Sequence, residues 1–149
     1  MASLHRIELR LKMLPTLPSV MSDWWAPLLP ENVSRRTAKK CDELLYHTIE
    51  LARNALECSD DALVIASVSP NEMTIFLSDS GPGLDPGFAL HHSRGGGFGF
   101  RHALSFADAF TVEVSGKRYE KRNNGLVYVG KGHVRCGTRI ILSKAFPTT

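Results

Sequence analysis

The chain has 149 residues, a length typical of one domain with a continuous core. Its residues are 43% hydrophobic and 22% charged, and no stretch approaches the roughly 20 apolar residues that a membrane-spanning helix needs. The formal charge of +3 is too small and too dispersed to predict direct nucleic-acid binding. We therefore expect a single domain over residues 1–149 that has neither a membrane nor a nucleic acid as its partner.

The N-terminal residues alternate between charged and apolar side chains, unlike the apolar centre of a signal peptide. This pattern predicts a cytoplasmic protein. The three cysteines are Cys41, Cys58 and Cys136, and they have no short paired spacing that would indicate a disulfide framework or a zinc site. We expect them to be buried free thiols.

A strand and a helix are the first predicted elements. Residues 4–12 alternate apolar and polar side chains after Ile7, which predicts a strand with one buried face. Pro18 then suits the first turn of a short helix. We interpret Trp24 and Trp25 in that helix as packing residues, because each ring carries a large apolar area.

The second predicted helix, over residues 37–58, has the clearest pattern in the chain. Its apolar stripe consists of Cys41, Leu45, Ile49, Ala52 and Leu56. Its opposite face carries Glu43, His47, Glu50, Asn54 and Glu57. Acidic and amide groups on such a face are most often solvated, so they indicate a site only if other motifs join them.

The rest of the chain predicts a sheet and one further helix. Residues 62–68 and 73–77 predict a hairpin, and Asp79 closes its second strand. Residues 80–99 hold seven of the twelve glycines and predict a loop. Helical spacing follows from Phe100 to Phe110.

Three apolar strands complete the pattern, over residues 111–115, 125–131 and 137–143. The basic residues within 117–122 are interpreted as a solvated hairpin end. The order β, α, α, β, β, loop, α, β, β, β predicts an α+β sandwich with helices on one face of a largely antiparallel sheet.

The first chemical motif, ELARNAL, places Glu50 and Asn54 four residues apart and side by side on the second helix. An amide oxygen is a hard ligand that suits magnesium. A neighbouring carboxylate can take a proton from an attacking hydroxyl or water. The pair can thus serve a metal-assisted reaction.

The second motif, DSGPGLDP, covers residues 79–86 and directly follows a predicted strand. A carboxylate fixed at a strand end can accept a hydrogen bond from an amino group such as that of adenine. Gly81 and Gly83 allow the backbone to approach a flat ligand closely. An ordinary tight turn accounts for the same residue types, so both interpretations stay open.

The third motif, RGGGFGFRHAL, places Gly95, Gly97 and Gly99 immediately before a predicted helix. Unpaired backbone amides at such a helix start can bind phosphates. The pattern lacks the Gly-Lys-Ser/Thr of a Walker loop and the parallel βαβ unit of a dinucleotide fold, so those classes are disfavoured. Nearby, His91 and His92 are expected to face solvent. Arg101 is equally consistent with a phosphate contact and with solvent exposure.

In this order, the three motifs resemble the N, G1 and G2 boxes of the GHKL superfamily of gyrase, heat-shock chaperone, histidine kinase and MutL ATPases. GTRIIL, at residues 137–142, is similar to the last strand of that family. The resemblance implies a two-layer α/β sandwich of the Bergerat type that binds ATP and Mg²⁺. It implies a role for each matching residue: Glu50 as catalytic base, Asn54 as magnesium ligand, Asp79 as adenine contact, Gly81 and Gly83 in the base pocket, Gly95, Gly97, Phe98 and Gly99 in the phosphate lid, and Thr138 beside the nucleotide.

The layout of the motifs is similar to that of the stand-alone anti-sigma regulatory kinases. That resemblance implies a serine/threonine kinase whose partner is a regulatory protein, such as a sigma factor or an anti-anti-sigma-like protein. One departure is Arg53, where those kinases often carry a small polar residue, and an arginine there could pair with phosphate or block it.

Alternatives stay open beside the kinase. Residues 99–110 are also similar to stretches of MutL and gyrase. This likeness implies a GHKL ATPase, or an ATP-gated module that switches a partner interface, as its lid closes. A degenerate domain that binds no nucleotide is a third alternative, and a homodimer is also compatible with the sequence.

Overall fold

The computed structural model describes residues 5–11, 17–28, 33–83, 97–123 and 125–147. Its helices are α1 (Leu17–Trp25), the short 3-10 helix η1 (Ala26–Leu28), α2 (Arg35–Cys58) and α4 (Gly97–Phe106). Its strands are β1 (His5–Leu11), β2 (Ala62–Val68), β3 (Glu72–Asp79), β4 (Ala109–Val114), β5 (Lys117–Arg122), β6 (Gly125–Lys131) and β7 (Thr138–Ala145).

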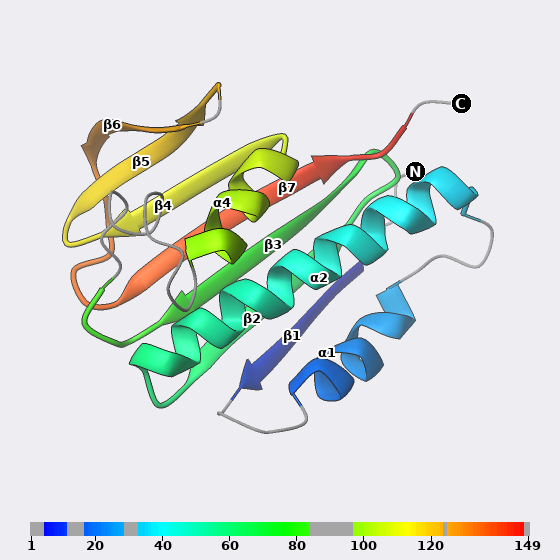
Figure 1. The fold of residues 1–149 in the computed structure, drawn as a ribbon, viewed down its shortest axis with the longest axis horizontal. Helices are drawn as coiled ribbons and strands as arrows, with labels where there is room; N and C mark the ends of the chain where they lie inside the picture. Colours follow the sequence, from blue (N-terminus) through cyan, green and yellow to red (C-terminus); the bar gives the residue numbers. More distant parts are fainter. Residues whose placement is uncertain (1–4, 12–16, 29–32, 84–96, 124, 148–149) are drawn as a thin grey trace.

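The strands form one seven-stranded sheet in the order β1-β2-β3-β7-β4-β5-β6 (Figure 1). Every neighbouring pair is antiparallel. The last strand, β7, lies between β3 and β4, so the end of β3 meets the start of β7 and Asp79 pairs with Thr138. The predicted α+β class and largely antiparallel sheet are confirmed.

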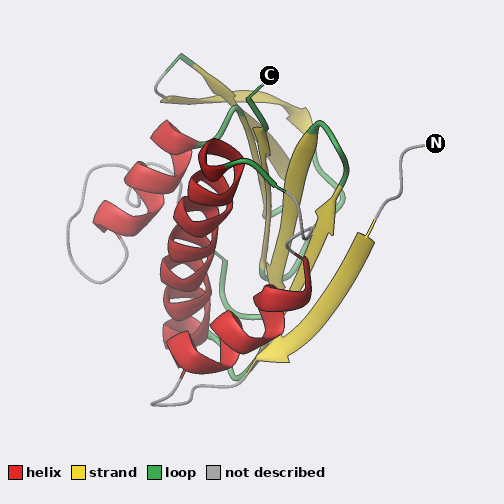
Figure 2. Cartoon of the chain, turned by 90° about the vertical axis from the view of Figure 1, so that its right-hand side faces the viewer, coloured by secondary structure: helices red, strands yellow, loops and turns green. Residues whose placement is uncertain are grey.

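The core lies between the sheet and helix α2, which runs beside the sheet in Figure 2. Alternate residues of β2 and β3 are buried, as expected where one face of a strand is covered. Val64 and Ile75 on these strands share a core cluster with Leu44 and Leu51 of α2. At the start of α2, the Ser34 hydroxyl accepts a hydrogen bond from the Thr37 amide at 3.2 Å, as an N-cap residue does.

The apolar stripe predicted on α2 is confirmed, but its other face is not simply solvated. His47, Glu50 and Asn54 are each only partly exposed, and α4 packs against α2. The prediction missed this contact because a single helix pattern cannot show a second helix that covers the polar side.

Three further predictions need correction. The basic segment predicted as a hairpin end is strand β5, which pairs with both β4 and β6. The last predicted helix ends at Phe106, and Phe110 belongs to β4. Cys41 is buried as expected, whereas Cys136 is exposed.

Trp25 is fully buried and Trp24 packs against the core, so both are packing residues as predicted. Among the described residues, no helix is both long enough and apolar enough to cross a membrane.

Candidate functional site

Helix α2 presents Glu50 to the first turn of α4. A Cβ atom added to Gly99 would lie 3.1 Å from the Cβ of Glu50, which is tighter than an ordinary van der Waals contact. Glycine at position 99 therefore allows the close approach of the two helices. Farther along the same interface, the ring of His47 lies 4.9 Å from the ring of Phe106. The ELARNAL motif and the end of the glycine-rich motif are thus adjacent in the fold.

The carboxylate of Glu50 forms an ion pair within its own helix. Arg53 Nη1 lies 2.8 Å from Glu50 Oε1, and the Glu50 side chain is 24% exposed. Asn54 lies one helical turn beyond Glu50 and is half-buried. The arginine that departs from the kinase pattern therefore contacts the residue expected to act as the base.

Asp79 lies at the end of β3 and is half-buried. Its Oδ1 accepts a hydrogen bond from the Gly81 amide at 2.9 Å. Burial raises the pKa of the Asp79 carboxyl above its ordinary value, although hydrogen bonds from the backbone amides of Gly81 and Thr138 act in the opposite direction. The result is a half-buried carboxylate at a strand end, as predicted, and its hydrogen bond to the Gly81 amide is also that of an ordinary tight turn.

Two glycines make room around Asp79. Gly83 has a φ of +95°, and an added Cβ would lie 2.9 Å from Cγ2 of Val114. Gly137 has a φ of +77°, and an added Cβ would overlap the carbonyl group of Asp79. Only glycine combines a positive φ with such close contacts. The turn after β3 and the start of β7 therefore pack directly against each other.

An open pocket of about 390 Å³ lies beside this turn. One wall comes from the last turn of α2 and the residues after it, and the other from the turn after Asp79. Its lining residues are Leu56, Glu57, Ser59, Asp60, Ser80 and Gly81. Helix α2 thus contributes to this pocket at its C-terminal end and meets α4 about two to three turns earlier.

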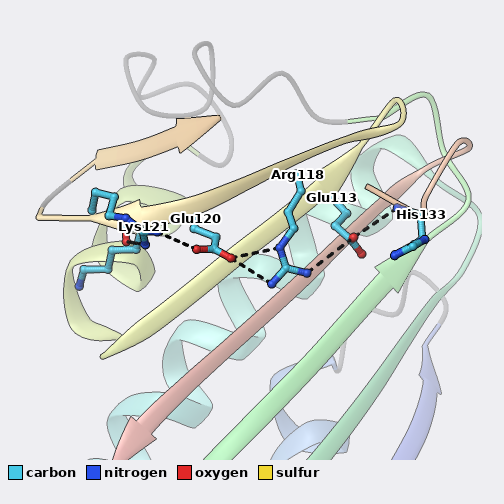
Figure 3. A network of polar contacts seen from close by, with 6 residues as sticks. Glu113, Arg118, Glu120, Lys121 and His133 are labelled. Carbon is cyan, nitrogen blue, oxygen red and sulfur yellow. Dashed lines mark hydrogen bonds and ion pairs between the residues drawn. The ribbon is translucent and has the colours of Figure 1, made fainter. Parts of the chain in front are cut away.

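A buried carboxylate that the sequence analysis missed supports the loop before β7 (Figure 3). The Glu113 side chain is 3% exposed. Its oxygens lie 3.3 Å from Arg139 Nη1, 3.9 Å from Arg118 Nη1 and 3.3 Å from the backbone amide of His133, which donates a hydrogen bond. The alternation of residues in β4 predicts that Glu113 lies on the face opposite Val112 and Val114. It does not predict that two arginines and a backbone amide surround the Glu113 carboxylate.

Backbone hydrogen bonds hold the same loop. The Gly116 amide donates to the Val134 carbonyl at 2.8 Å, and the Gly132 amide donates to the Gly116 carbonyl at 2.9 Å. Together with Glu113, these bonds fix the connection that carries Gly137 to its place beside Asp79. These hydrogen bonds join residues that are far apart in the sequence, so the sequence alone does not predict them.

Some of the predicted site residues lie wholly or partly outside the described residues. Gly95, His91 and His92 lie outside the described residues, and so does the side chain of Phe98. Gly97 begins α4. Thr138 is buried beside Asp79, whereas Arg101 is exposed. Within the part of the chain that the structure describes, no group of three or more His, Cys, Asp or Glu side chains could hold a metal ion.

Comparison with known proteins adds no relative to this description. No protein-family model matches the chain, and no curated protein matches its sequence.

Proposed function

We propose that the chain is an ATP-binding domain of the Bergerat type and a member of the GHKL superfamily. In this proposal, its helices cover one face of the antiparallel sheet. It acts in the cytoplasm as a protein kinase of the anti-sigma type, transferring the γ-phosphoryl group of ATP to a serine or threonine of a regulatory partner protein. Such a partner would be a sigma factor or an anti-anti-sigma-like protein.

The observation that carries the proposal is the position of α2. This helix contacts the start of α4 at Glu50 and Gly99, and its end lines a pocket with Ser80 and Gly81. Residues of all three motifs therefore lie around one helix. Figure 2, which draws helices α1, α2 and α4 beside the sheet, is compatible with the proposed two-layer fold.

The donor set fits a nucleotide with a divalent cation. The half-buried carboxylate of Asp79 suits an exocyclic amino group, because a desolvated acceptor at a strand end can bind such a donor strongly. Asn54 would supply one amide oxygen to Mg²⁺, with phosphate oxygens and water as the other ligands, as is common for Mg²⁺ in nucleotide sites. The bound cation would neutralise charge on the phosphates.

In the proposed reaction, Glu50 accepts the proton of the attacking hydroxyl. Its ion pair with Arg53 at 2.8 Å holds the carboxylate along its own helix. Glu50 must therefore rotate away from Arg53 to reach a substrate hydroxyl. Phosphoryl transfer otherwise depends on positioning and charge neutralisation.

The same ion pair favours a second candidate function. If Glu50 remains paired with Arg53, the domain would bind ATP and change its partner interface without transferring phosphate. This function corresponds to an ATP-gated module, whereas an ATPase, the other form of this alternative, transfers the phosphoryl group to water.

Labelled ATP separates the two candidates. The protein is incubated with γ-labelled ATP, magnesium and the protein products of its neighbouring genes, and the label on protein and in free phosphate is counted. The kinase proposal predicts a labelled partner, and it predicts that Glu50→Gln slows transfer by about 100-fold, because a general base contributes on the order of 10²–10⁴. Asp42→Asn, an exposed substitution on the same helix, is the matched control and should transfer at the wild-type rate.

Bound ATP without any labelled partner would favour the gated module. Release of free phosphate alone would favour an ATPase. Equal transfer rates for wild type and Glu50→Gln would contradict the role of Glu50 as base.

A further inference from the structure

Strand β6 forms one edge of the sheet, at the opposite end from β1 (Figure 1). It pairs with β5 along one side, and within the described ranges of the chain no strand pairs with the backbone amides and carbonyls of its other side. The pairing is regular from Gly125 to Tyr128, and a register shift follows at Arg118 and Tyr119 of β5. A free edge with a regular ladder can accept another strand.

Three consecutive apolar side chains are exposed on this edge. Val127 is 45% exposed, Tyr128 is 56% exposed and Val129 is 41% exposed. Protected edges usually carry charged residues or prolines instead. Tyr128 is held by the ring of Tyr119 at 5.8 Å, so the edge has an ordered apolar side chain at its centre.

Two lysines lie opposite each other at the end of the same edge. Lys117 pairs with Lys131 in the ladder, and both residues are exposed. Like charges at directly opposite positions are unfavourable. Within the described residues, neither lysine has an acidic partner.

The other cations nearby are already engaged. Arg118 and Arg122 both pair with Glu120, at 3.1 Å and 3.0 Å. The ammonium group of Lys121 donates to the carbonyl groups of Ser105 and Ala107 at the end of α4. Lys117 and Lys131 are therefore the two cations of this hairpin whose ammonium groups have neither a carboxylate nor a carbonyl partner among the described residues.

We propose that β6 binds an extended segment of a partner protein as an additional antiparallel strand. The segment has apolar residues opposite Val127 and Tyr128, and it carries carboxylates at its N-terminal end. In an antiparallel arrangement, like that of every other pair in this sheet, the N-terminal end of the segment lies beside Lys131, and Lys117 lies one strand farther from it on β5. This surface is independent of the proposed nucleotide site, and its occupation needs no ATP.

Charge favours such a segment over a second copy of the chain. Antiparallel pairing of two β6 strands about Tyr128 would place Lys131 of the copy beside Gly125, which is the ladder partner of Arg122. Positive charge would accumulate at both ends of that dimer. A nucleic acid would neutralise the lysines, but it offers no peptide groups to the free backbone edge.

A ten-residue synthetic peptide tests the proposal. It has blocked ends, two glutamates at its N-terminus and alternating valine and tyrosine after them, and fluorescence anisotropy measures its affinity for the full chain without nucleotide. We expect saturable binding. Replacing the glutamates with lysines should weaken binding at least about tenfold, and N-methylation of alternate backbone amides should do the same, since about 1.4 kcal/mol corresponds to a tenfold change.

Variants of the chain locate the binding surface. Val127→Asp should weaken binding of the glutamate peptide at least about tenfold. Lys131→Glu leaves the apolar edge intact, places a carboxylate opposite Lys117 and should remove most of the preference for the glutamate peptide. The matched control is Glu8→Lys on β1, the other edge strand, and it should bind like the wild type. Circular dichroism would confirm that each variant is folded.

The proposal is overturned if the N-methylated peptide binds as tightly as the unmodified one, or if Lys131→Glu leaves the charge preference unchanged. It is also overturned if a ten-nucleotide single strand of thymidines binds at this edge more tightly than the peptide. A concentration-dependent dimer that Val127→Asp abolishes would identify a second copy as the occupant instead.

Discussion

At the scale of single residues, Asp79 contributes to the pH dependence of stability and is also the proposed contact of the adenine amino group. Its carboxylate is half-buried, and burial raises the pKa even though two backbone amides favour the ionised form. A folded-state pKa above the unfolded value means that the native state binds a proton more tightly than the unfolded state. Stability contributed by this group is therefore lost as the pH rises through the interval that starts near the ordinary pKa of about 3.9.

Replacement of Asp79 by asparagine tests this linkage. Asparagine has nearly the same shape and stays neutral at every pH in this range. At pH 7, the free energy of unfolding of Asp79→Asn should equal or exceed that of the wild type, and the difference should shrink towards pH 3.5, as Asp79 becomes protonated in the unfolded state as well. Urea denaturation at several pH values measures this difference in the free energy of unfolding. A variant that is less stable at pH 7 than the wild type, but equally stable at pH 3.5, would contradict the assigned direction.

Sequence reasoning placed some candidate site residues in the right elements of the fold because their signals are local. The spacing of Glu50 and Asn54 places them on one helix face, and turn chemistry places Asp79 at the end of a strand. Glu113 escaped notice, and Gly137 was recognised only as part of GTRIIL, since their contacts are with residues distant in the sequence. The positive φ of Gly137 and its contact with the Asp79 carbonyl depend on the insertion of β7 beside β3.

At the scale of elements, the hydrophobic patterns predicted most helices and strands. Strand β5 was missed because its sequence, KRYEKR, has only one apolar residue and resembles an exposed turn. Backbone hydrogen bonds to β4 on one side and β6 on the other hold β5 in the sheet, although its sequence lacks an apolar pattern. Phe110 fits the helical spacing by chance, since it belongs to the strand that follows α4.

Substitution of two turn glycines, Gly116 and Gly137, tests how tightly the connection before β7 is packed. Gly116 and Gly137 have nearly equal positive φ values, of +73° and +77°. An added Cβ meets nothing within 4 Å at Gly116 and overlaps the Asp79 carbonyl at Gly137. The pair therefore separates the cost of the backbone conformation from the cost of the overlap.

We expect Gly116→Ala to lower the free energy of unfolding by about 1–2 kcal/mol, the usual cost of a left-handed conformation. Gly137→Ala should lower it by at least about 1 kcal/mol more, as overpacked sites do. Urea denaturation of both variants measures the two values. Equal losses would show that the contact with Asp79 does not restrict position 137.

At the scale of the whole molecule, the sheet order determines which motifs meet. The hairpin of β2 and β3 and the antiparallel class followed from local patterns, whereas the position of β7 between β3 and β4 did not. That position pairs Asp79 with Thr138. Helix α2 then lies against α4 and reaches the pocket beside Gly81. Binding of ATP by this arrangement, the Bergerat assignment and the partner remain predictions.

Calorimetric titration of ATP into the wild type and into Asn54→Ala, each with and without magnesium, tests the central claim most directly. We predict that the wild type binds ATP and that magnesium tightens its binding. Asn54→Ala should bind ATP alone like the wild type and lose most of the gain from magnesium. Failure of the wild type to bind ATP, or an equal gain from magnesium in both proteins, would contradict this account.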